Sequence, residues 1–325
     1  MPVNTLTQQD VWEAKKRISP SAANTPLIYA PELSDRTGAT IHLKLENLNE
    51  SGSFKIRGAT NKIFSLSAEQ KEKGVTTFST GNFGVSVAIV ASKLGIKAII
   101  CISQRVPKAK VDALKRTGAK VEIVGESQDD AEKYCYQLEQ EHGLTVVHPF
   151  DDPYIIAGQG TIGLELLEEL PEVDTVIGGL SGGGLHAGLG AALKPANAGI
   201  RVIGVSTDRG AAMYESINAG KPVTVEEQDT LADSLLGGIG LNNQYTFHMV
   251  QQYVDTILRL HEEGFASGMT YMLEKHRMAV EGAAAAGVGA ILHERVRPGS
   301  HAVIVISGSS VDPATIFSLT QDGKL

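Results

Sequence analysis

Short apolar segments alternate with amphipathic segments along most of the chain, and this alternation constrains the fold more than any other feature. Up to residue 148 the apolar segments are rich in β-branched residues, and the segments between them have helical spacing. The pattern predicts strands over residues 75–79, 97–102, 120–124 and 144–148. It predicts helices over residues 81–94, 107–117 and 127–142. Four strands separated by helices are typical of a parallel sheet covered by helices.

The alternation resumes after a break at His148-Pro-Phe-Asp-Asp-Pro153. Here it predicts strands over residues 174–180, 201–206 and 301–306, and helices over 154–170, 185–193 and along 262–294. A length of 325 residues agrees with two domains. We therefore expect an α/β protein with two open parallel-sheet domains. A smaller domain, residues 71–146, is inserted into a larger one made of residues 1–70 and 147–325.

The charge balance limits the kinds of partner. Lys and Arg total 29 against 37 Asp and Glu, a net charge of −8, which argues against nucleic acid or an anionic membrane surface. The two cysteines, Cys101 and Cys135, are too few for a disulfide framework or a zinc cluster. The first 18 residues contain no apolar segment like that of a secretory signal. We expect a soluble, cytoplasmic protein.

A glycine-rich loop stands between a predicted strand and a predicted helix. Ser181-Gly-Gly-Gly-Leu185 follows the apolar segment 174–180 and opens the helix. Backbone N–H groups of such a loop can close on an anion, and the helix N-terminus attracts negative charge. The loop is expected to bind phosphate, although a merely flexible connection would have a similar sequence.

The residues that follow the loop narrow the choice of phosphate ligand. A Walker loop needs Gly-Lys-Ser/Thr, but Leu185-His186 stands there. The dinucleotide fingerprint needs a glycine where Ala187 stands, and the next strand ends without an acidic residue for a ribose. These departures favour a small phosphorylated cofactor over a nucleotide.

Lys55 lies among small residues and one aromatic residue, in Ser51-Gly-Ser-Phe-Lys-Ile-Arg-Gly58. A lysine in such surroundings can lose its proton and act as a nucleophile or form a Schiff base, although most lysines are simply solvated. A reactive lysine together with a phosphate-binding loop is what pyridoxal phosphate requires of a protein.

Five motifs, taken in their order along the chain, carry a resemblance to a known family. They are Ser53-Phe-Lys-Ile-Arg-Gly58, Ser79-Thr-Gly-Asn-Phe-Gly84, Gly158-Gln-Gly-Thr-Ile-Gly163, Ser181-Gly-Gly-Gly-Leu185 and Ser307-Gly308. The chain resembles the fold-type II pyridoxal-phosphate enzymes, which have the tryptophan synthase β-like fold, and within them the threonine/serine dehydratase and serine racemase branch. The segment Ser234-Leu-Leu-Gly-Gly-Ile-Gly-Leu-Asn242, with Tyr245-Thr-Phe247, resembles more narrowly the hydroxyectoine-utilisation dehydratases.

The resemblance implies a role for each motif residue. Lys55 would carry pyridoxal phosphate covalently and, once released by substrate, remove the Cα proton. Phe54 would pack near the cofactor ring or belong to the core, and Asn82 would hydrogen-bond the ring hydroxyl or cap a helix. The phosphate would be held by Ser181, Gly182, Gly183, Gly184 and Leu185. The substrate carboxylate would be bound by Ser79, Thr80 and Gly81, which could instead be a helix-capping cluster.

Ser307 would meet the pyridine nitrogen of the cofactor, although a serine after a strand can also form a turn. A hydroxyl cannot balance a full positive charge on that nitrogen as a carboxylate would, so the ring is a weaker electron sink. Rapid loss of a substituent from Cβ is then favoured, which gives elimination a physical reason. Glu281 lies in a segment that resembles one near the cofactor, where a helix-end role is as plausible as a functional one.

Three departures from the family pattern bear on function. The usual histidine after the cofactor asparagine is Phe83 here, which changes the expected pocket wall. Thr80 stands where the racemases have serine, which weakens racemisation without excluding it. Ser206 and Ala212 stand where cation-activated relatives use Glu and Asp, so we expect no metal site there.

Together these features lead to one expected activity, a pyridoxal-phosphate-dependent ammonia-lyase. It would eliminate water from a β-hydroxy amino acid, threonine- or serine-like or derived from hydroxyectoine, and yield a 2-oxo acid and ammonia. An amino-acid racemase on the same scaffold is the close alternative, and a cofactor-binding sensor without chemistry is another. The partners expected are a small-molecule substrate and a second copy of the chain, in a homodimer.

Overall fold

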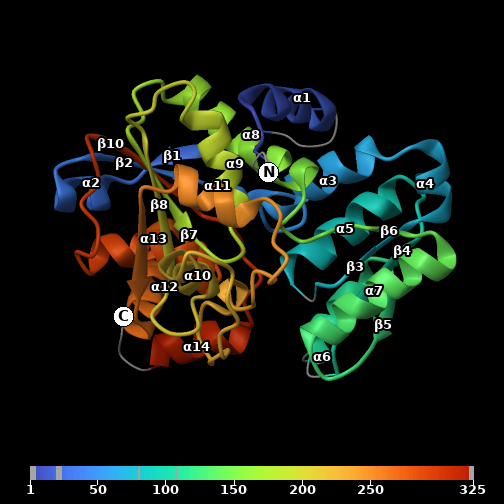
Figure 1. Cartoon of the computed structure of the whole chain (residues 1–325). Helices are drawn as coiled ribbons and strands as arrows, with labels where there is room; N and C mark the ends of the chain where they lie inside the picture. Colours follow the sequence, from blue (N-terminus) through green and yellow to red (C-terminus); the bar gives the residue numbers. More distant parts are fainter. Residues whose placement is uncertain (1–4, 20–23, 80, 105, 107, 322–325) are drawn as a thin grey trace.

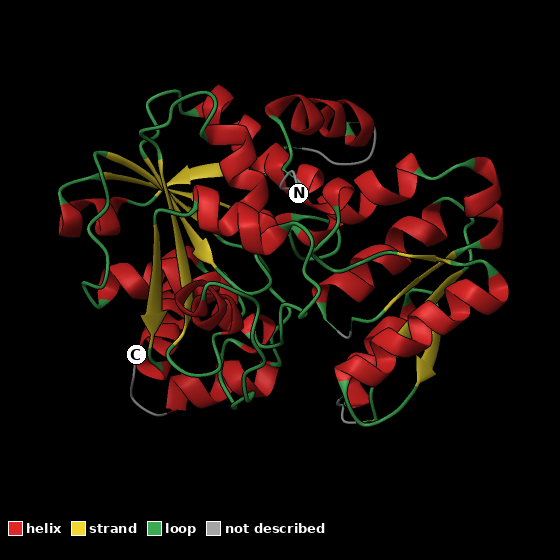
Figure 2. Ribbon diagram, viewed as in Figure 1, coloured by secondary structure: helices red, strands yellow, loops and turns green. Residues whose placement is uncertain are grey.

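Two separate sheets organise the chain, one in each α/β domain (Figures 1 and 2). The computed structural model describes residues 5–19, 24–79, 81–104, 106 and 108–321. The sheet of the larger domain has the strand order β1 (Leu27–Tyr29), β2 (Thr40–Lys44), β10 (His301–Val305), β7 (Thr175–Gly179), β8 (Arg201–Thr207) and β9 (Thr256–Leu260). All neighbours pair in parallel except β1, which runs antiparallel to β2 at the edge, so the expected parallel sheet carries one antiparallel strand.

The sheet of the smaller domain is parallel throughout. Its order is β5 (Lys120–Ile123), β4 (Ala98–Ile102), β3 (Val75–Thr77) and β6 (Thr145–Val146). Its helices are α4 (Ala68–Lys73), α5 (Asn82–Lys93), α6 (Lys108–Arg116) and α7 (Gln128–His142). These strands begin and end within two residues of the predicted positions, and all four lie inside the segment 71–146 that we expected to be inserted.

Helices cover both faces of the larger sheet (Figure 2). They are α1 (Gln8–Ile18), α2 (Pro31–Thr37), α3 (Lys55–Ser65), α8 (Pro153–Glu169), α9 (Gly184–Leu193), α10 (Ala212–Ala219), α11 (Thr246–Tyr253), α12 (Glu262–His276), α13 (Gly282–Leu292) and α14 (Pro313–Gln321), with 3-10 turns η1 (Glu46–Leu48) and η2 (Asp233–Leu235). The helical pattern 262–294 divides into α12 and α13 because Arg277 adopts the left-handed conformation, with φ 58°. Within the described residues, no helix is long and apolar enough to cross a bilayer.

The core of the larger domain follows the alternation of side chains along its strands. On β10, Ala302 and Ile304 pack with α12 and α13 on one face, while Val303 and Val305 pack with α8 and α9 on the other. A strand buried on both faces has a continuous apolar sequence, which is why this strand and β7 are recognisable without a polar–apolar alternation. The carboxyl ends of β7 and β10 therefore lie side by side.

Helix α3 links the two domains, because it packs against α8 on one side and α5 on the other. Its position is fixed by a buried ion network around Arg57, two residues after Lys55. The Arg57 guanidinium contacts Glu46 at 2.7 Å and Glu165 of α8 at 2.5 Å, and Lys44 of β2 contacts Glu165 at 2.8 Å. Truncating one member would leave its buried partner charge uncompensated, so α3 is held firmly to β2 and α8.

Candidate active site

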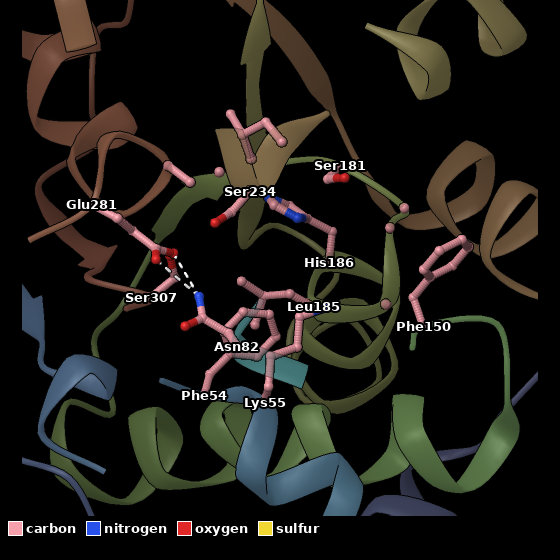
Figure 3. A pocket seen from close by; sticks show the side chains of 16 residues that line it. Phe54, Lys55, Asn82, Phe150, Ser181, Leu185, His186, Ser234, Glu281 and Ser307 are labelled. Atoms are coloured by element: carbon pink, nitrogen blue, oxygen red, sulfur yellow. Dashed lines mark hydrogen bonds between the residues drawn. The ribbon is translucent and has the colours of Figure 1, made fainter. Parts of the chain in front are cut away.

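The N-terminal ends of four helices meet at one pocket near the carboxyl ends of β7 and β10 (Figure 3). Lys55 begins α3, Asn82 begins α5, Gly184 begins α9, and Glu281 precedes α13. The pocket contains about 450 Å³ free of protein atoms, part of it open to solvent. Helix N-termini present unpaired N–H groups and partial positive charge, so this arrangement favours an anionic ligand.

In the glycine loop, residues 181–184, the three glycines leave no room for side chains. Gly183 has φ +88°, a conformation that favours glycine, and a Cβ there would lie 2.8 Å from Met213 and Val250. A Cβ on Gly182 would lie 2.6 Å from the Phe150 ring. The backbone can therefore approach a ligand at the start of α9 as closely as a phosphate requires.

Lys55 lines the same pocket, with its amine near two aromatic rings. Its Nζ lies 5.1 Å from the Phe54 ring centroid and 5.8 Å from that of Phe83, and it donates a hydrogen bond of 3.3 Å to the Pro149 carbonyl. Burial lowers the pKa of Lys55 to about 8, and the nearby charge of Glu281 limits that fall. A substantial fraction of this amine is therefore neutral near physiological pH, as a nucleophile or base must be.

Asn82 and Glu281 meet across the pocket (Figure 3). The Asn82 Nδ2 lies 2.9 Å from each carboxylate oxygen of Glu281, which is 3% exposed. Burial raises the pKa of Glu281 to about 7, while the hydrogen bond from Asn82 acts in the opposite direction.

Two motifs about 250 residues apart in the sequence lie side by side here. The Phe54 N–H donates to the Ser307 carbonyl at 3.0 Å, and Ser53 forms an antiparallel bridge with Gly308. Phe54, Lys55 and Ser307 consequently line the same pocket.

The expected substrate residues are not all brought to this pocket. Among the described lining residues, neither Ser79 nor Gly81 is present, although Asn82 next to them is. Thr80 lies outside the described residues. Phe83 is buried in the core between α3 and α5, and its ring centroid lies 5.8 Å from Lys55 Nζ, so the expectation that it changes the pocket wall stays a prediction.

Ser206 and Ala212, from which we predicted the absence of a cation site, are both buried in the larger domain. The Ser206 hydroxyl donates a hydrogen bond of 2.5 Å to the Leu180 carbonyl, and Ala212 is buried at the start of α10. Within the described part of the chain, no group of three or more His, Cys, Asp and Glu side chains is placed to hold a metal ion.

No individual role was predicted for six lining residues, although two of them, Ser234 and Leu235, lie in the segment that resembles the hydroxyectoine-utilisation dehydratases. The six are Phe150, Gly179, His186, Ser234, Leu235 and Ala283. Phe150 belongs to the break between the two alternating regions, where we assigned no function. Its N–H donates to His148 Nδ1 at 3.3 Å, and burial lowers the pKa of His148 to about 4, so this ring is a neutral acceptor at neutral pH. The break therefore places an aromatic ring against the glycine loop.

A comparison with family models decides the identity. The model of the pyridoxal-phosphate dependent enzymes matches residues 18–308. The chain belongs to this family. Pyridoxal phosphate is its cofactor, and the glycine cradle, the buried Lys55 amine and the four helix N-termini fit the phosphate and aldehyde of that molecule.

Individual relatives match almost the whole of this family member. A Sinorhizobium fredii protein provisionally named a threonine dehydratase is 44% identical over 311 residues, covering 95% of this chain and 94% of its own length. The L-threonine ammonia-lyase of Thermotoga maritima is 39% identical over 318 residues, covering 98% and 79%. The structure of maize serine racemase superimposes with a TM-score of 0.91 at 33% identity, covering 98% of each chain. The predicted fold class, with two parallel-sheet domains, is confirmed.

Proposed function

We propose that this pyridoxal-phosphate enzyme is an ammonia-lyase that eliminates water from a β-hydroxy amino acid and yields a 2-oxo acid and ammonia. The observation that carries the proposal is the Lys55 amine, its pKa lowered to about 8, in one pocket with the glycine loop. The relatives named as threonine dehydratase and ammonia-lyase, which match nearly the whole chain, support the type of reaction.

Each group in the pocket has a defined task in this proposal. The loop of Ser181, Gly182, Gly183, Gly184 and Leu185 holds the phosphate, and Phe54, Asn82 and Ser307 orient the ring. When bound, the cofactor supplies an electron sink for the electrons left at the substrate Cα. Lys55 Nζ binds the cofactor before substrate arrives and afterwards takes the Cα proton.

The elimination then needs only a proton for the leaving hydroxyl. The bond from Cβ to oxygen breaks, and the proton held on Lys55 Nζ returns to that oxygen, so that water leaves. Release of the enamine and its hydrolysis by water give the 2-oxo acid and ammonia. We propose that Ser79, Thr80 and Gly81, which precede α5 in the sequence, bind the substrate carboxylate in this reaction.

Threonine, serine, hydroxyaspartate and an acyclic product of hydroxyectoine breakdown are the candidate substrates. The names of the curated relatives favour threonine. The segment that resembles hydroxyectoine-utilisation enzymes contributes Ser234 and Leu235 to the pocket, which supports the last candidate.

Racemisation is the second candidate activity, because a serine racemase superimposes so closely on the chain. One experiment separates the possibilities. The cofactor-loaded protein is incubated with each candidate substrate, and 2-oxo acid, ammonia and the enantiomer of the recovered amino acid are measured. The proposal predicts 2-oxo acid and ammonia in equal amounts. Enantiomer without 2-oxo acid would identify a racemase, and neither product would favour a cofactor-binding sensor.

Three further points belong to the same proposal. The protein acts in the cytoplasm as a homodimer, and its smaller domain spans residues 71–146. The cysteines Cys101 and Cys135 are free thiols in the smaller domain, as expected in a reducing compartment. Light scattering of the purified protein tests the dimer, for which a single species of 34.4 kDa would be contradictory.

A further inference from the structure

The contact between Asn82 and Glu281 connects the two domains at the edge of the pocket. Asn82 is the first residue of α5, which belongs to the smaller domain, whereas Glu281 precedes α13 of the larger one. The Nδ2 atom of Asn82 donates to both carboxylate oxygens, each at 2.9 Å (Figure 3). An acceptor of this kind fixes the plane of the amide as well as its distance, because both oxygens share one donor nitrogen.

Glu281 is not explained as a helix cap. It occupies the position before the first turn of α13, but its side chain makes no hydrogen bond to the N–H groups of that turn. The carboxylate instead points toward Asn82 in the pocket (Figure 3). Burying a carboxylate costs free energy, so its contact with Asn82 calls for a role other than starting the helix.

Gly308 provides the space that this pair occupies. A Cβ on Gly308 would lie 2.8 Å from Glu281 Oε1 and 3.1 Å from Asn82 Nδ2. The Glu281 N–H also donates to the Gly308 carbonyl at 3.3 Å. The Ser-Gly motif after β10 thus accommodates the contact between the domains.

The protonation state of Glu281 determines whether its carboxylate holds the Asn82 amide. Two charged groups interact with the Glu281 carboxylate, namely Lys55 of α3 and Asp233 of η2. Hydrogen bonds from Asn82, Ser234 and the Ser310 backbone favour the ionised form. Protonation turns one carboxyl oxygen into a donor, and Nδ2 of Asn82 offers it no acceptor, so the contact weakens below a pH of about 7.

We propose that Glu281 is a positioning residue whose ionised carboxylate holds the Asn82 amide at the pocket and fixes α5 against α13. It acts on the cofactor through Asn82. The inference rests on cofactor binding at the proposed site and does not depend on which reaction follows.

A double-mutant cycle tests this directly. Pyridoxal phosphate is titrated into cofactor-free wild type, Glu281→Gln, Asn82→Ala and the double variant, at pH 8.5 and at pH 5.5. At pH 8.5 we expect Glu281→Gln alone to raise Kd about tenfold, the size expected for one hydrogen bond to a charged group. In the Asn82→Ala background the same change should have almost no effect, because the residue through which Glu281 acts is gone. At pH 5.5 its effect in the wild-type background should shrink toward none.

Matched controls keep the result interpretable. Glu263→Gln removes an exposed carboxylate from α12 and should leave Kd unchanged. Circular dichroism and Tm report whether each variant folds, and Glu281→Asp, which keeps the charge but shortens the side chain, replaces Glu281→Gln if the latter does not. Additive effects, or an effect of equal size at both pH values, would overturn the inference. A wild type that binds no cofactor would instead refute the proposed site.

Discussion

Lys55 owes its chemistry to neighbours that come from distant parts of the sequence. The motif around it was not sufficient to single it out, because most lysines are simply solvated; the phosphate-binding loop and the family resemblance were needed as well. The group that limits the fall of its pKa, Glu281, is 226 positions further along, and the carbonyl that accepts from its amine belongs to Pro149. Motifs spread along the sequence could therefore predict which lysine is reactive, whereas its electrostatic environment required the fold.

The pH dependence of cofactor attachment is the prediction at this scale. The rate at which pyridoxal phosphate attaches to cofactor-free protein should rise with pH and level off above about 8, because only the neutral amine attacks and burial lowers the pKa of Lys55. The change in visible absorption after rapid mixing measures it. An exposed model lysine, which should not level off until about pH 10.4, is the control. If the rate of attachment to Lys55 had the same pH dependence as that of the exposed model lysine, the Lys55 amine would be solvated.

At the scale of elements, α8 sets the distance between the lysine and the glycine loop. The sequence marked Gly158-Gln-Gly-Thr-Ile-Gly163 as a motif but could not say that its glycines face two other helices. A Cβ on Gly158 would lie 2.7 Å from Gly58 of α3, and one on Gly160 would lie 2.8 Å from the Gly188 carbonyl of α9. The absence of side chains lets α3 and α9, which carry Lys55 and the glycine loop, approach α8 closely.

Gly188→Ala tests this packing. The added Cβ would lie 2.5 Å from two backbone atoms, Gly160 N and the Ile156 carbonyl oxygen, which cannot rotate away. We expect a loss of about 1–3 kcal/mol in the free energy of unfolding, measured by urea denaturation, together with weaker cofactor binding. Gly238→Ala is the matched control, since its Cβ would meet nothing closer than 3.9 Å. If the two variants were equally stable, the contact between α8 and α9 could accommodate a Cβ at position 188.

Helices and strands were predicted correctly where the hydrophobic periodicity of the sequence is strong. The prediction failed for strands that are defined mainly by pairing with a neighbouring strand. In the smaller domain α5, α6 and α7 begin and end within one residue of the predicted positions, partly because Ser127 caps α7 and Gly143 ends it, whereas α4 was not predicted. Strands β1, β2 and β9 were not predicted. Their residues are only partly buried because they lie at or next to the edges of the larger sheet, where pairing rather than burial defines the strand.

For the whole molecule, the topology explains why one pocket collects residues from both domains. Parallel strands present their carboxyl ends at one edge, and the loops that follow β7 and β10 meet there. The alternation of strands and helices predicted the two sheets. The sequence did not predict the contact of Phe150 with the glycine loop or the pairing of Asn82 with Glu281, because these depend on how the domains lie against each other.

Chelation gives a prediction at the same scale. Because Ser206 and Ala212 supply no carboxylate, EDTA should change neither turnover nor Tm of the cofactor-loaded protein. Activity assays and thermal melts with and without EDTA measure this, with EDTA saturated by magnesium as the control. Activity lost on chelation and restored by magnesium would locate cation ligands elsewhere in the chain.

The most direct test of the central claim compares wild type with Lys55→Ala in the presence of pyridoxal phosphate and a substrate identified from the panel. The claim is that Lys55 both binds the cofactor and moves the Cα proton. The variant should therefore lack the visible absorption of lysine-bound cofactor and lose nearly all formation of 2-oxo acid, by about a thousandfold or more. Its circular dichroism should match that of wild type, and exposed Lys275→Ala should retain both properties. A folded Lys55→Ala variant that forms 2-oxo acid at the wild-type rate would contradict the claim.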